Sequence, residues 1–473
     1  MSGGPGARPD DGIGRGRVRR GAPLVGLAAR TAGEAVVAGL RGRLSGADGA
    51  EFHARTAERY ADLLGRSKGA LMKAGQMLSI VSVGSFVPAE MQSAYQTALA
   101  RLRDDAPPMS GELAQMLLER ELGREAMSEI AELEREPLAA ASIGQVHAAR
   151  LRDGRRVAVK IQYPGVADAI RADLKNTELL ATFLSLIGGI SSHPLSLDLR
   201  GAAREIGERI TEELDYRLEA ANQAEFAARY RDHPFIHVPE VLSELSSARV
   251  LTQELCLGRC WAEALTADRE LRDCWAEAIW RFVYGSHRRF GLTNIDPHPG
   301  NYVFHDDGSV SFLDFGCVKR YRRDQVELIT RIVRECLRED VPGTWRACVE
   351  AGFWSSSDPV TPEEVFAWWH EPFRYLWDEQ PFTITPEYAA SWIERRVSPY
   401  GPSGNALRHA TLAPEYVAWP RIEMALSSVL GQLRATNDWA AMYAEYHADG
   451  QPLTVMGRLD QAYFAQRAAT RVV

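Results

Sequence analysis

The sequence predicts an α+β fold, because residues with strand periodicity occur in only two parts of an otherwise helical chain. β-Branched and aromatic residues form short strand-like segments between residues 133 and 255, and again between residues 301 and 313. Segments with Ala and Leu at helical spacing precede, separate and follow them. A chain of 473 residues is long enough for two or more lobes.

Composition narrows the class of protein. Hydrophobic residues make up 45% of the chain and charged residues 25%, which is typical of soluble globular proteins. The net charge of -8 gives no reason to expect nucleic-acid binding. The six Cys form no CxxC pair and indicate reduced thiols in a cytoplasmic protein. The best candidate for a membrane span, residues 179–190, is too short, and no signal peptide is visible.

The first 131 residues have two parts. Residues 1–30 are rich in Gly, Arg and Pro, and we expect them to be disordered because they have little to bury. This basic tail is either solvated or held electrostatically at an anionic membrane surface. Residues 31–131 have helical patterns. In the helix predicted at 51–81, Lys73 and Gln76 are three positions apart and point the same way.

A loop of very small residues separates two predicted strands, 133–139 and 145–151. Its residues are Ala139, Ala140, Ala141, Ser142, Ile143 and Gly144. Small residues let the main chain come close to nucleotide phosphates. The next predicted strand, 155–162, places Ala158 and Lys160 on one face. Its VAVK resembles the VAIK of protein kinases, whose Lys binds the phosphates.

A long helix predicted at 198–230 carries several acidic residues, of which Asp215 and Glu219 are four positions apart and share a face. One of its acids should pair with Lys160, as the corresponding Glu does in kinases. Two strands are predicted next, at 238–242 and 249–255. The connection to the second lobe follows them, and main-chain groups there would bind adenine, at Glu254, Leu255 and Cys256.

The strongest signal for chemistry lies near residue 300. Asp296 and Asn301 have the spacing of the catalytic Asp and the metal-binding Asn in the kinase catalytic loop. Two short strands, joined by the hairpin signal Asp307-Gly308, then lead to Asp314 in a DFG triplet. A hairpin places its two ends side by side, so Asn301 and Asp314 are expected to offer oxygen ligands to one Mg²⁺. The stretch predicts a phosphoryl-transfer site.

After residue 320 the sequence is helical and rich in Trp, with clear helices predicted at 325–339 and 362–377. Aromatic residues of the second helix are interpreted as core residues, with a lipid-facing groove as the weaker alternative. These residues are Trp368, Trp369, Tyr375 and Trp377.

Six motifs, taken together and in order, resemble those of the UbiB (AarF) family of atypical kinase-like proteins. They are LMKAGQ, AAASIGQVHAA, VAVKIQYPGV, EELDYRLEAAN, DPHPGN and LDFG. The resemblance implies a bilobal protein-kinase-like fold. Its parts would be an N-terminal helical extension at 31–131, a kinase-like N-lobe at 132–257 and a mostly helical C-lobe at 258–473. In the family the extension lies over the active site, which disfavours protein phosphorylation.

The resemblance also implies roles for single residues. Lys160 would bind the phosphates of ATP or ADP, with Glu219 as its ion-pair partner. Asp296 would be the catalytic-loop Asp, and Asn301 and Asp314 the ligands of Mg²⁺. The regulatory contact between the KxGQ and ExD elements of the family would fall to Lys73, Gln76, Glu213 and Asp215.

Members of the family behave as ATPases that support the biosynthesis or distribution of isoprenoid lipids such as quinones, often at membranes. The resemblance therefore implies an isoprenoid-lipid or quinone-pathway partner. The C-terminal part has no hydrophobic span, so any membrane contact should be peripheral. One departure is residues 292–295, which read LTNI where many members have FHA. It puts substrate preference in doubt more than nucleotide binding.

Two other classes of protein compete with this interpretation. Small-molecule phosphotransferases of the aminoglycoside-kinase type also have an HxDxxxxN motif, but they lack KxGQ and usually DFG. A catalytically inactive kinase-like scaffold is the second alternative. The presence of all four residues expected for nucleotide chemistry argues against a scaffold, namely Lys160, Asp296, Asn301 and Asp314.

Overall fold

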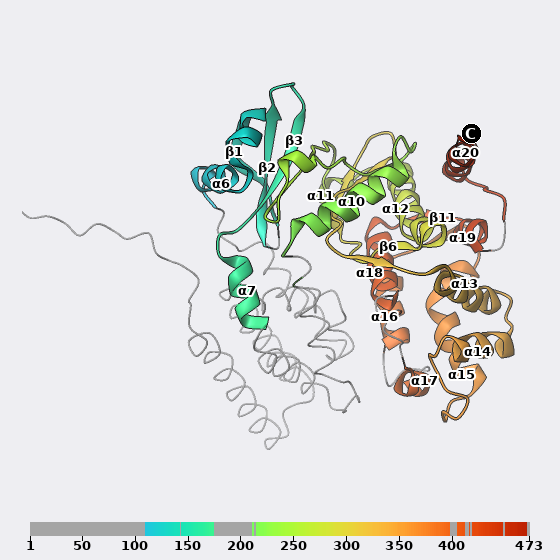
Figure 1. Cartoon of the computed structure of the whole chain (residues 1–473). Coiled ribbons are helices and arrows are strands. Elements are labelled where there is room, and N and C mark those ends of the chain that lie inside the picture. Colours follow the sequence, from blue (N-terminus) through green and yellow to red (C-terminus); the bar gives the residue numbers. More distant parts are fainter. Residues whose placement is uncertain are drawn as a thin grey trace, which may run out of the picture. The chain divides into compact units, whose positions relative to one another are not determined.

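The computed structural model of the chain describes residues 109–141, 143–174, 211, 214–397, 404–411, 416, 419–447 and 450–470 (Figure 1). Within these ranges the chain contains both helices and β-strands, so the predicted α+β class is confirmed. Four of the predicted site residues lie outside the described residues, namely Lys73, Gln76, Ser142 and Glu213.

The chain divides into two compact units. The first comprises Met1–Glu121, Glu134–His147 and Lys160–Leu214, and the second Leu122–Leu133, Ala148–Val159 and Asp215–Val473. The division crosses the strands of one sheet instead of following the predicted lobe boundary. The predicted limits at residues 31, 132 and 258 therefore stay predictions.

Four strands form the sheet predicted for the smaller lobe, in the order β1-β2-β3-β5. They are β1 (Ile130–Ala141), β2 (Gly144–Leu151), β3 (Arg156–Gln162) and β5 (Val250–Glu254). Gly154 has a φ of 90° in the turn between β2 and β3, as the predicted hairpin requires. The loop predicted from Ala139 to Gly144 is wrong in extent, because β1 continues through Ala141 and β2 already begins at Gly144.

Three helices are described around this sheet: α6 (Gly111–Glu129), α7 (Val166–Leu174) and α10 (Tyr216–Tyr230). The prediction of one helix from 198 to 230 is wrong near Asp215. This residue has an extended main chain, and its carboxylate accepts a hydrogen bond from the Arg217 N–H as the N-cap of α10. Asp215 therefore precedes the helix on which Glu219 lies, and the two do not share a helical face.

The predicted hairpin near residue 300 is confirmed. Strand β7 (Tyr302–Phe304) pairs antiparallel with β8 (Val310–Phe312), and Gly308 has a φ of 85° in the turn. The short strand β4 (Ile236–His237) extends this sheet in parallel pairing with β8. It replaces the strand predicted at 238–242, of which only Val241 pairs, through a single bridge to Gln253. Strands β6 (Leu292–Asn294) and β9 (Val318–Arg320) form a separate antiparallel pair.

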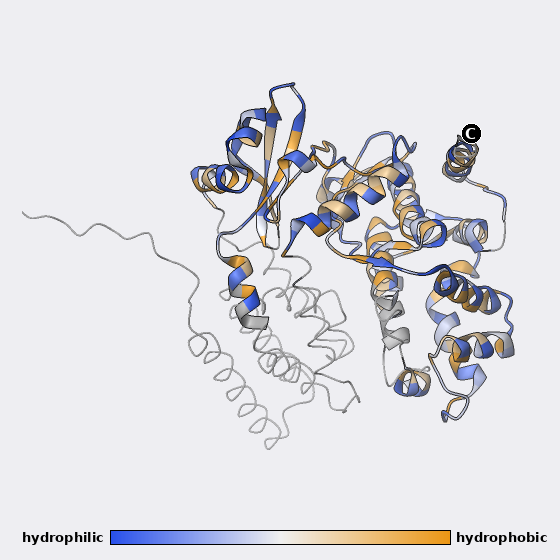
Figure 2. Cartoon of the chain, in the orientation of Figure 1, coloured by the Kyte–Doolittle hydropathy of each residue, from blue (hydrophilic) through white to orange (hydrophobic). Residues whose placement is uncertain are grey.

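Helices build most of the rest of the second unit. They begin with α11 (Trp261–Ala264) and α12 (Arg269–Phe290), and continue with α13 (Arg323–Leu337), α14 (Val341–Glu350), α15 (Pro362–His370), α16 (Pro386–Val397), α17 (Gly404–His409), α18 (Trp419–Leu433), α19 (Trp439–His447) and α20 (Val455–Thr470). Hydrophobic and hydrophilic residues alternate along α13 in Figure 2. Its Val326, Ile329 and Val333 are buried at helical spacing, as expected for an amphipathic helix.

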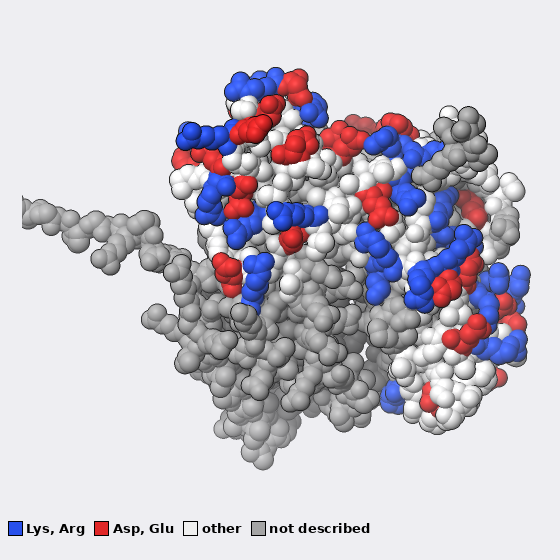
Figure 3. Space-filling view, viewed as in Figure 1, with Lys and Arg blue, Asp and Glu red and all other residues white. Residues whose placement is uncertain are grey.

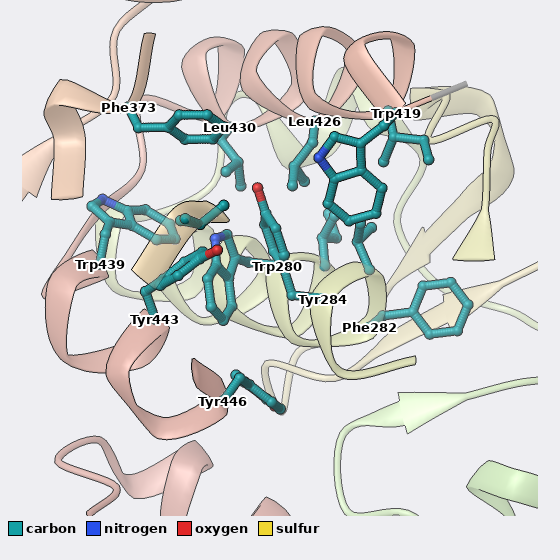
Figure 4. Packing of buried hydrophobic residues seen from close by; sticks show 14 of the residues in the cluster. Trp280, Phe282, Tyr284, Phe373, Trp419, Leu426, Leu430, Trp439, Tyr443 and Tyr446 are labelled. Atoms are coloured by element: carbon teal, nitrogen blue, oxygen red, sulfur yellow. The ribbon is translucent and has the colours of Figure 1, made fainter. Parts of the chain in front are cut away.

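The core of the second unit is aromatic. Tyr284 of α12 points toward Leu426 and Leu430 of α18, and Trp280 of α12 lies beside Tyr443 of α19 (Figure 4). The aromatic residues predicted to be in the core are there. Trp368, Trp369 and Tyr375 are buried, and Trp377 packs against them partly exposed.

Helix α20 packs against the end of α10 through polar contacts. Arg467 Nη2 donates to the main-chain oxygen of Ala228 at 2.9 Å, and the Tyr463 hydroxyl donates to that of Arg231 at 2.6 Å. The buried carboxylate of Asp460 contacts His233 Nε2 at 3.1 Å. Carbonyl groups at the end of α10, which lack partners inside the helix, are therefore satisfied by α20.

No helix among the described residues is long and apolar enough to cross a bilayer. On the face shown in Figure 3, basic and acidic side chains of the described residues are interspersed.

Candidate functional site

The catalytic loop predicted at Asp296 to Asn301 folds back on itself. The His298 N–H donates to Asp296 O at 2.7 Å, and the Asn301 N–H donates to His298 O at 2.9 Å in the short turn Pro299–Asn301. Asn301 Nδ2 lies 3.4 Å from Asp296 O. Both side chains are partly exposed, whereas Ile295 and Tyr302 on either side are buried. The spacing of five residues thus brings Asn301 next to the main chain of Asp296.

The hairpin brings Asp314 beside Asn301. The Leu313 N–H donates to Asn301 O at 3.0 Å. This bond lies next to Tyr302–Phe312, the residue pair of the hairpin that is farthest from its turn. One carboxylate oxygen of Asp314 accepts a hydrogen bond from the Gly316 N–H at 2.9 Å, which orients the side chain. Carboxylate and amide oxygens are the ligands that Mg²⁺ prefers, so this pair fits the predicted ion.

Asn294 joins the two acidic loops, a role that the sequence did not reveal. Its Nδ2 donates to Asp314 O at 2.7 Å, and its Oδ1 accepts from the Asp296 N–H at 3.0 Å. The residue is buried at the end of β6. The unusual LTNI sequence was the signal here, although we expected it to affect the substrate and not the internal support of the site.

Helix α10 supports the DFG segment from a second side. Its face with Glu219, Gln223 and Phe226 is buried, and the ring centroid of Phe226 lies 4.9 Å from that of Phe315. Helix α10, which carries Glu219, therefore packs against the DFG segment through Phe226 and Phe315. Glu219, Asp296, Asn301 and Asp314 all belong to the second unit.

Lys160 lies on β3 in the first unit, partly exposed between the buried Val159 and Ile161. Ala158 on the same strand is buried, while Ala139 and Ala140 at the end of β1 are exposed. The structure explains why residue 144 is a glycine. A Cβ atom there would collide with the main-chain oxygen of Ile161, so the residue lets β2 and β3 approach each other.

The segment expected to bind adenine begins where β5 ends. The Glu254 carboxylate accepts a hydrogen bond from the Glu240 N–H at 3.0 Å, and the Leu255 N–H already donates to Arg156 O at 3.3 Å. Cys256 is partly buried, and burial raises the pKa of its thiol. The Glu254 N–H also donates to Glu240 O at 3.0 Å, so the main-chain N–H groups of both Glu254 and Leu255 already have partners within the protein. Main-chain contacts of Glu254 and Cys256 with the base stay a prediction.

The described part of the chain contains no cluster of three or more His, Cys, Asp or Glu that could hold a metal ion. A zinc or iron centre of that kind finds no support there. The residues that fit a cation are the Asn301 and Asp314 pair, whose oxygen ligands suit a hard ion with water or phosphate completing its shell.

Comparisons with known proteins show which proteins the chain is similar to. The family model described as ABC1 atypical kinase-like domain matches residues 101–346. The chain is 32% identical over 316 residues to the Protein ACTIVITY OF BC1 COMPLEX KINASE 1, chloroplastic, of Arabidopsis thaliana, covering 66% of this chain and 44% of that protein. It is 33% identical over 279 residues to the atypical kinase COQ8B, mitochondrial, of Rattus norvegicus, covering 59% and 51%. The chain thus spans about half the length, or less, of these relatives.

A solved structure is also similar. It is described as the complex structure of Rv3197-erythromycin from Mycobacterium tuberculosis, with a TM-score of 0.58 and 31% sequence identity. The match covers 81% of this chain and 93% of that one. Together with the family model, this similarity confirms the predicted kinase-like fold.

Proposed function

Because the chain belongs to the ABC1 family of atypical kinase-like proteins, we propose that it binds a nucleotide with Mg²⁺ and hydrolyses ATP or transfers its terminal phosphoryl group. The observation that carries this proposal is the adjacency of Asn301 and Asp314, joined by the hydrogen bond from Leu313 N–H to Asn301 O at 3.0 Å. Phosphoryl transfer depends mainly on positioning and on neutralising phosphate charge, which two adjacent oxygen ligands and their ion supply.

The other residues take roles that follow from their chemistry. Asp296 would orient the attacking water or the hydroxyl of an acceptor, because its carboxylate can accept the proton that leaves. Lys160 would bind the nucleotide phosphates, with Glu219 holding its ammonium group in place. Main-chain groups of Glu254 and Cys256 would contact adenine. The end of β1, the turn that follows it and the start of β2 would cover the phosphates, and Ala158 on β3 would also line the nucleotide site. The residues of the first group are Ala139, Ala140, Ala141, Ser142, Ile143 and Gly144.

The N-terminal extension would suppress protein phosphorylation. In this proposal the KxGQ residues Lys73 and Gln76 meet the ExD residues Glu213 and Asp215 over the active site, where a peptide substrate would bind. The physiological role would be support of isoprenoid quinone or other lipid biosynthesis at a membrane surface. The similarity to proteins named COQ8 favours this role. Transfer to a small molecule and a nucleotide-binding scaffold without turnover are the alternatives.

Nucleotide binding is the first test. Binding of a fluorescent ADP analogue to the purified chain is titrated with Mg²⁺ for the native sequence, Asp314→Asn and Asp306→Asn. The matched control Asp306 lies in the same hairpin but forms an exposed ion pair with Arg259 at 2.7 Å. Asp314→Asn should abolish the Mg²⁺-dependent binding and Asp306→Asn should leave it unchanged. Equal binding by all three proteins would overturn the assignment of the metal ligands.

Turnover is the second test. ATP hydrolysis is measured with and without vesicles of anionic phospholipid, and with and without a quinone-like phenol. Stimulation by the vesicles or the phenol supports the lipid-linked ATPase. A phosphorylated small product would instead indicate a phosphotransferase, and Mg²⁺-dependent binding without turnover would indicate a scaffold.

Binding of a macrolide is a second candidate function, favoured by one observation. The similar solved structure is a complex with erythromycin, and the match extends over most of both chains. Titration with erythromycin, followed by intrinsic Trp fluorescence, tests this candidate. An unchanged emission spectrum together with unchanged thermal unfolding would reject it.

A further inference from the structure

Two asparagine side chains hold consecutive main-chain carbonyl groups of the DFG segment. Asn294 Nδ2 donates to Asp314 O at 2.7 Å, and Asn222 Nδ2 donates to Phe315 O at 3.0 Å. The donors come from different elements, since Asn294 ends β6 and Asn222 lies in the middle of α10. The main chain on either side of the Asp314–Phe315 peptide is therefore fixed from two directions.

The amide group is chemically suited to the position of Asn294. Its Nδ2 faces a carbonyl oxygen, which can only accept a hydrogen bond, and its Oδ1 faces the Asp296 N–H, which can only donate. A carboxylate in its place would set two acceptors against each other. An aliphatic side chain would leave the Asp296 N–H and the Asp314 C=O, both partly buried, without this partner. One side chain thus couples the main chain of Asp296 to that of Asp314.

Asn222 is held in the same way on the opposite side. Its Oδ1 accepts from Arg320 Nη2 at 3.0 Å, and the same Nη2 lies 2.8 Å from a carboxylate oxygen of Glu225 on α10. One turn further along α10, Phe226 packs against the ring of Phe315. Helix α10 therefore contacts both the carbonyl group and the ring of the residue that follows Asp314.

We propose that Asn294 and Asn222 are positioning residues that fix the consecutive main-chain carbonyl groups of Asp314 and Phe315, and thereby direct the Asp314 carboxylate toward the magnesium–nucleotide complex. This inference rests on the proposed function. Neither residue touches the ion or the nucleotide in this mechanism. Asn294 ties the loop of the proposed catalytic Asp296 to the proposed metal-binding loop at Asp314, and Asn222 ties α10, with Glu219, to the next carbonyl group, that of Phe315.

The test measures how much Mg²⁺ is needed for binding of the fluorescent ADP analogue. The proteins are the native sequence, Asn294→Asp, Asn294→Ala, Asn294→His, Asn222→Ala and Gln223→Ala. Gln223 is the matched control, because it neighbours Asn222 on α10 and its Nε2 donates to a main-chain carbonyl at 2.8 Å, but that carbonyl belongs to Pro239. Thermal unfolding without ligand is measured for each variant.

Loss of a positioning residue should raise the Mg²⁺ concentration at half-maximal binding about 10- to 100-fold, the usual effect of removing an outer partner of a metal ligand. Asn294→Asp should be affected most, and Asn222→Ala clearly more than Gln223→Ala at equal loss of thermal stability. The variant Asn294→His should recover part of the affinity lost in Asn294→Ala, because a neutral imidazole has one donor and one acceptor nitrogen.

Each result has one meaning. If the native protein shows no Mg²⁺-dependent binding, the proposed function fails before the variants are compared. If it binds and the Asn variants need no more Mg²⁺ than Gln223→Ala, the positioning role is overturned and the proposed function stands. If Asn294→Asp does not fold, the comparison of Asn222→Ala with Gln223→Ala decides the matter.

Discussion

The ring of Phe226 packs against the ring of Phe315, with centroids 4.9 Å apart and planes inclined at 42°. Neither side chain is accessible to solvent. Because Phe315 directly follows Asp314, this contact ties the acidic loop to the hydrophobic core of the second unit. The position of α10 and the position of the proposed metal ligand are therefore set by one buried pair.

Replacing Phe226 by Ala should lower the free energy of unfolding by about 3–5 kcal/mol, as is usual for removal of a buried Phe side chain. Phe226→Leu keeps most of the volume and should cost less than about 1.5 kcal/mol. Denaturant unfolding followed by Trp fluorescence measures both. Equal losses for the two variants would show that the contact with Phe315 is not sensitive to the volume of the side chain.

Two buried histidines should make the protein sensitive to acid. Burial lowers the pKa of His287 and of His447 from 6.5 to about 3. The unfolded chain binds a proton on each near pH 6.5, whereas the folded chain does not. Stability is therefore fully present above pH 6.5 and is lost as the pH falls toward 3, by up to about 1.4 kcal/mol per pH unit for each residue.

Urea unfolding at a series of pH values between 7 and 4 measures this loss. The variant His447→Gln lacks one titrating group. As the pH falls, its free energy of unfolding should therefore decrease less steeply than that of the native protein, and the two slopes should differ by about 1.4 kcal/mol per pH unit. Parallel curves for the two proteins would contradict the assignment of the acid sensitivity to His447.

The cysteines should differ in reactivity. Cys260 is exposed, whereas burial raises the pKa of the thiols of Cys256 and Cys274 and keeps them protonated near neutral pH. Brief alkylation followed by peptide mass spectrometry should label Cys260 first. A bound nucleotide should slow the labelling of Cys256 further, because the base is proposed to lie beside it. Cys274 on α12 serves as the control, and equal protection of both thiols would argue against adenine at Cys256.

The contact of α20 with α10 should control the dynamics of the helix that carries Glu219. Arg467→Ala removes the hydrogen bond to Ala228 O and should lower stability by about 0.5–1.5 kcal/mol. Amide hydrogen exchange should become faster in the last turn of α10, at Ala227 to Tyr230. Arg458→Ala is the matched control, since Arg458 Nη1 donates only within the same segment, to Leu453 O at 2.8 Å. Equally slow amide hydrogen exchange at these residues in Arg467→Ala and Arg458→Ala would contradict the coupling of α20 to the end of α10.

Features that depend on neighbouring residues could be predicted from the sequence. The hairpin at Asp307-Gly308 followed from a glycine that tolerates positive φ, and the core role of Trp368 and Trp369 followed from helical spacing. The motifs carried the family resemblance, which the match to the ABC1 family model confirms. Local chemistry and motif order were sufficient for these conclusions.

Features that depend on distant residues could not be predicted in this way. Asn222 and Phe315 are 93 positions apart, and no local pattern distinguishes an amide that binds a remote carbonyl from one that faces water. Arg281 on α12 looked like any helical Arg, yet its side chain is fully buried and pairs with Glu277 and Glu445. The break before α10 was also missed, because Asp215 as an N-cap interrupts a stretch whose hydrophobic spacing continues through it.

The bond between Arg467 and Ala228 joins residues 239 positions apart. At typical elongation rates of about 5–20 residues per second, a ribosome needs about 10–50 s to make the chain between them. During that interval the end of α10 is already synthesised while the side chain that covers its carbonyl groups does not yet exist. A growing polypeptide of this kind therefore has an interval in which chaperones can act on an incomplete second unit, and this interval ends only when α20 emerges from the ribosome.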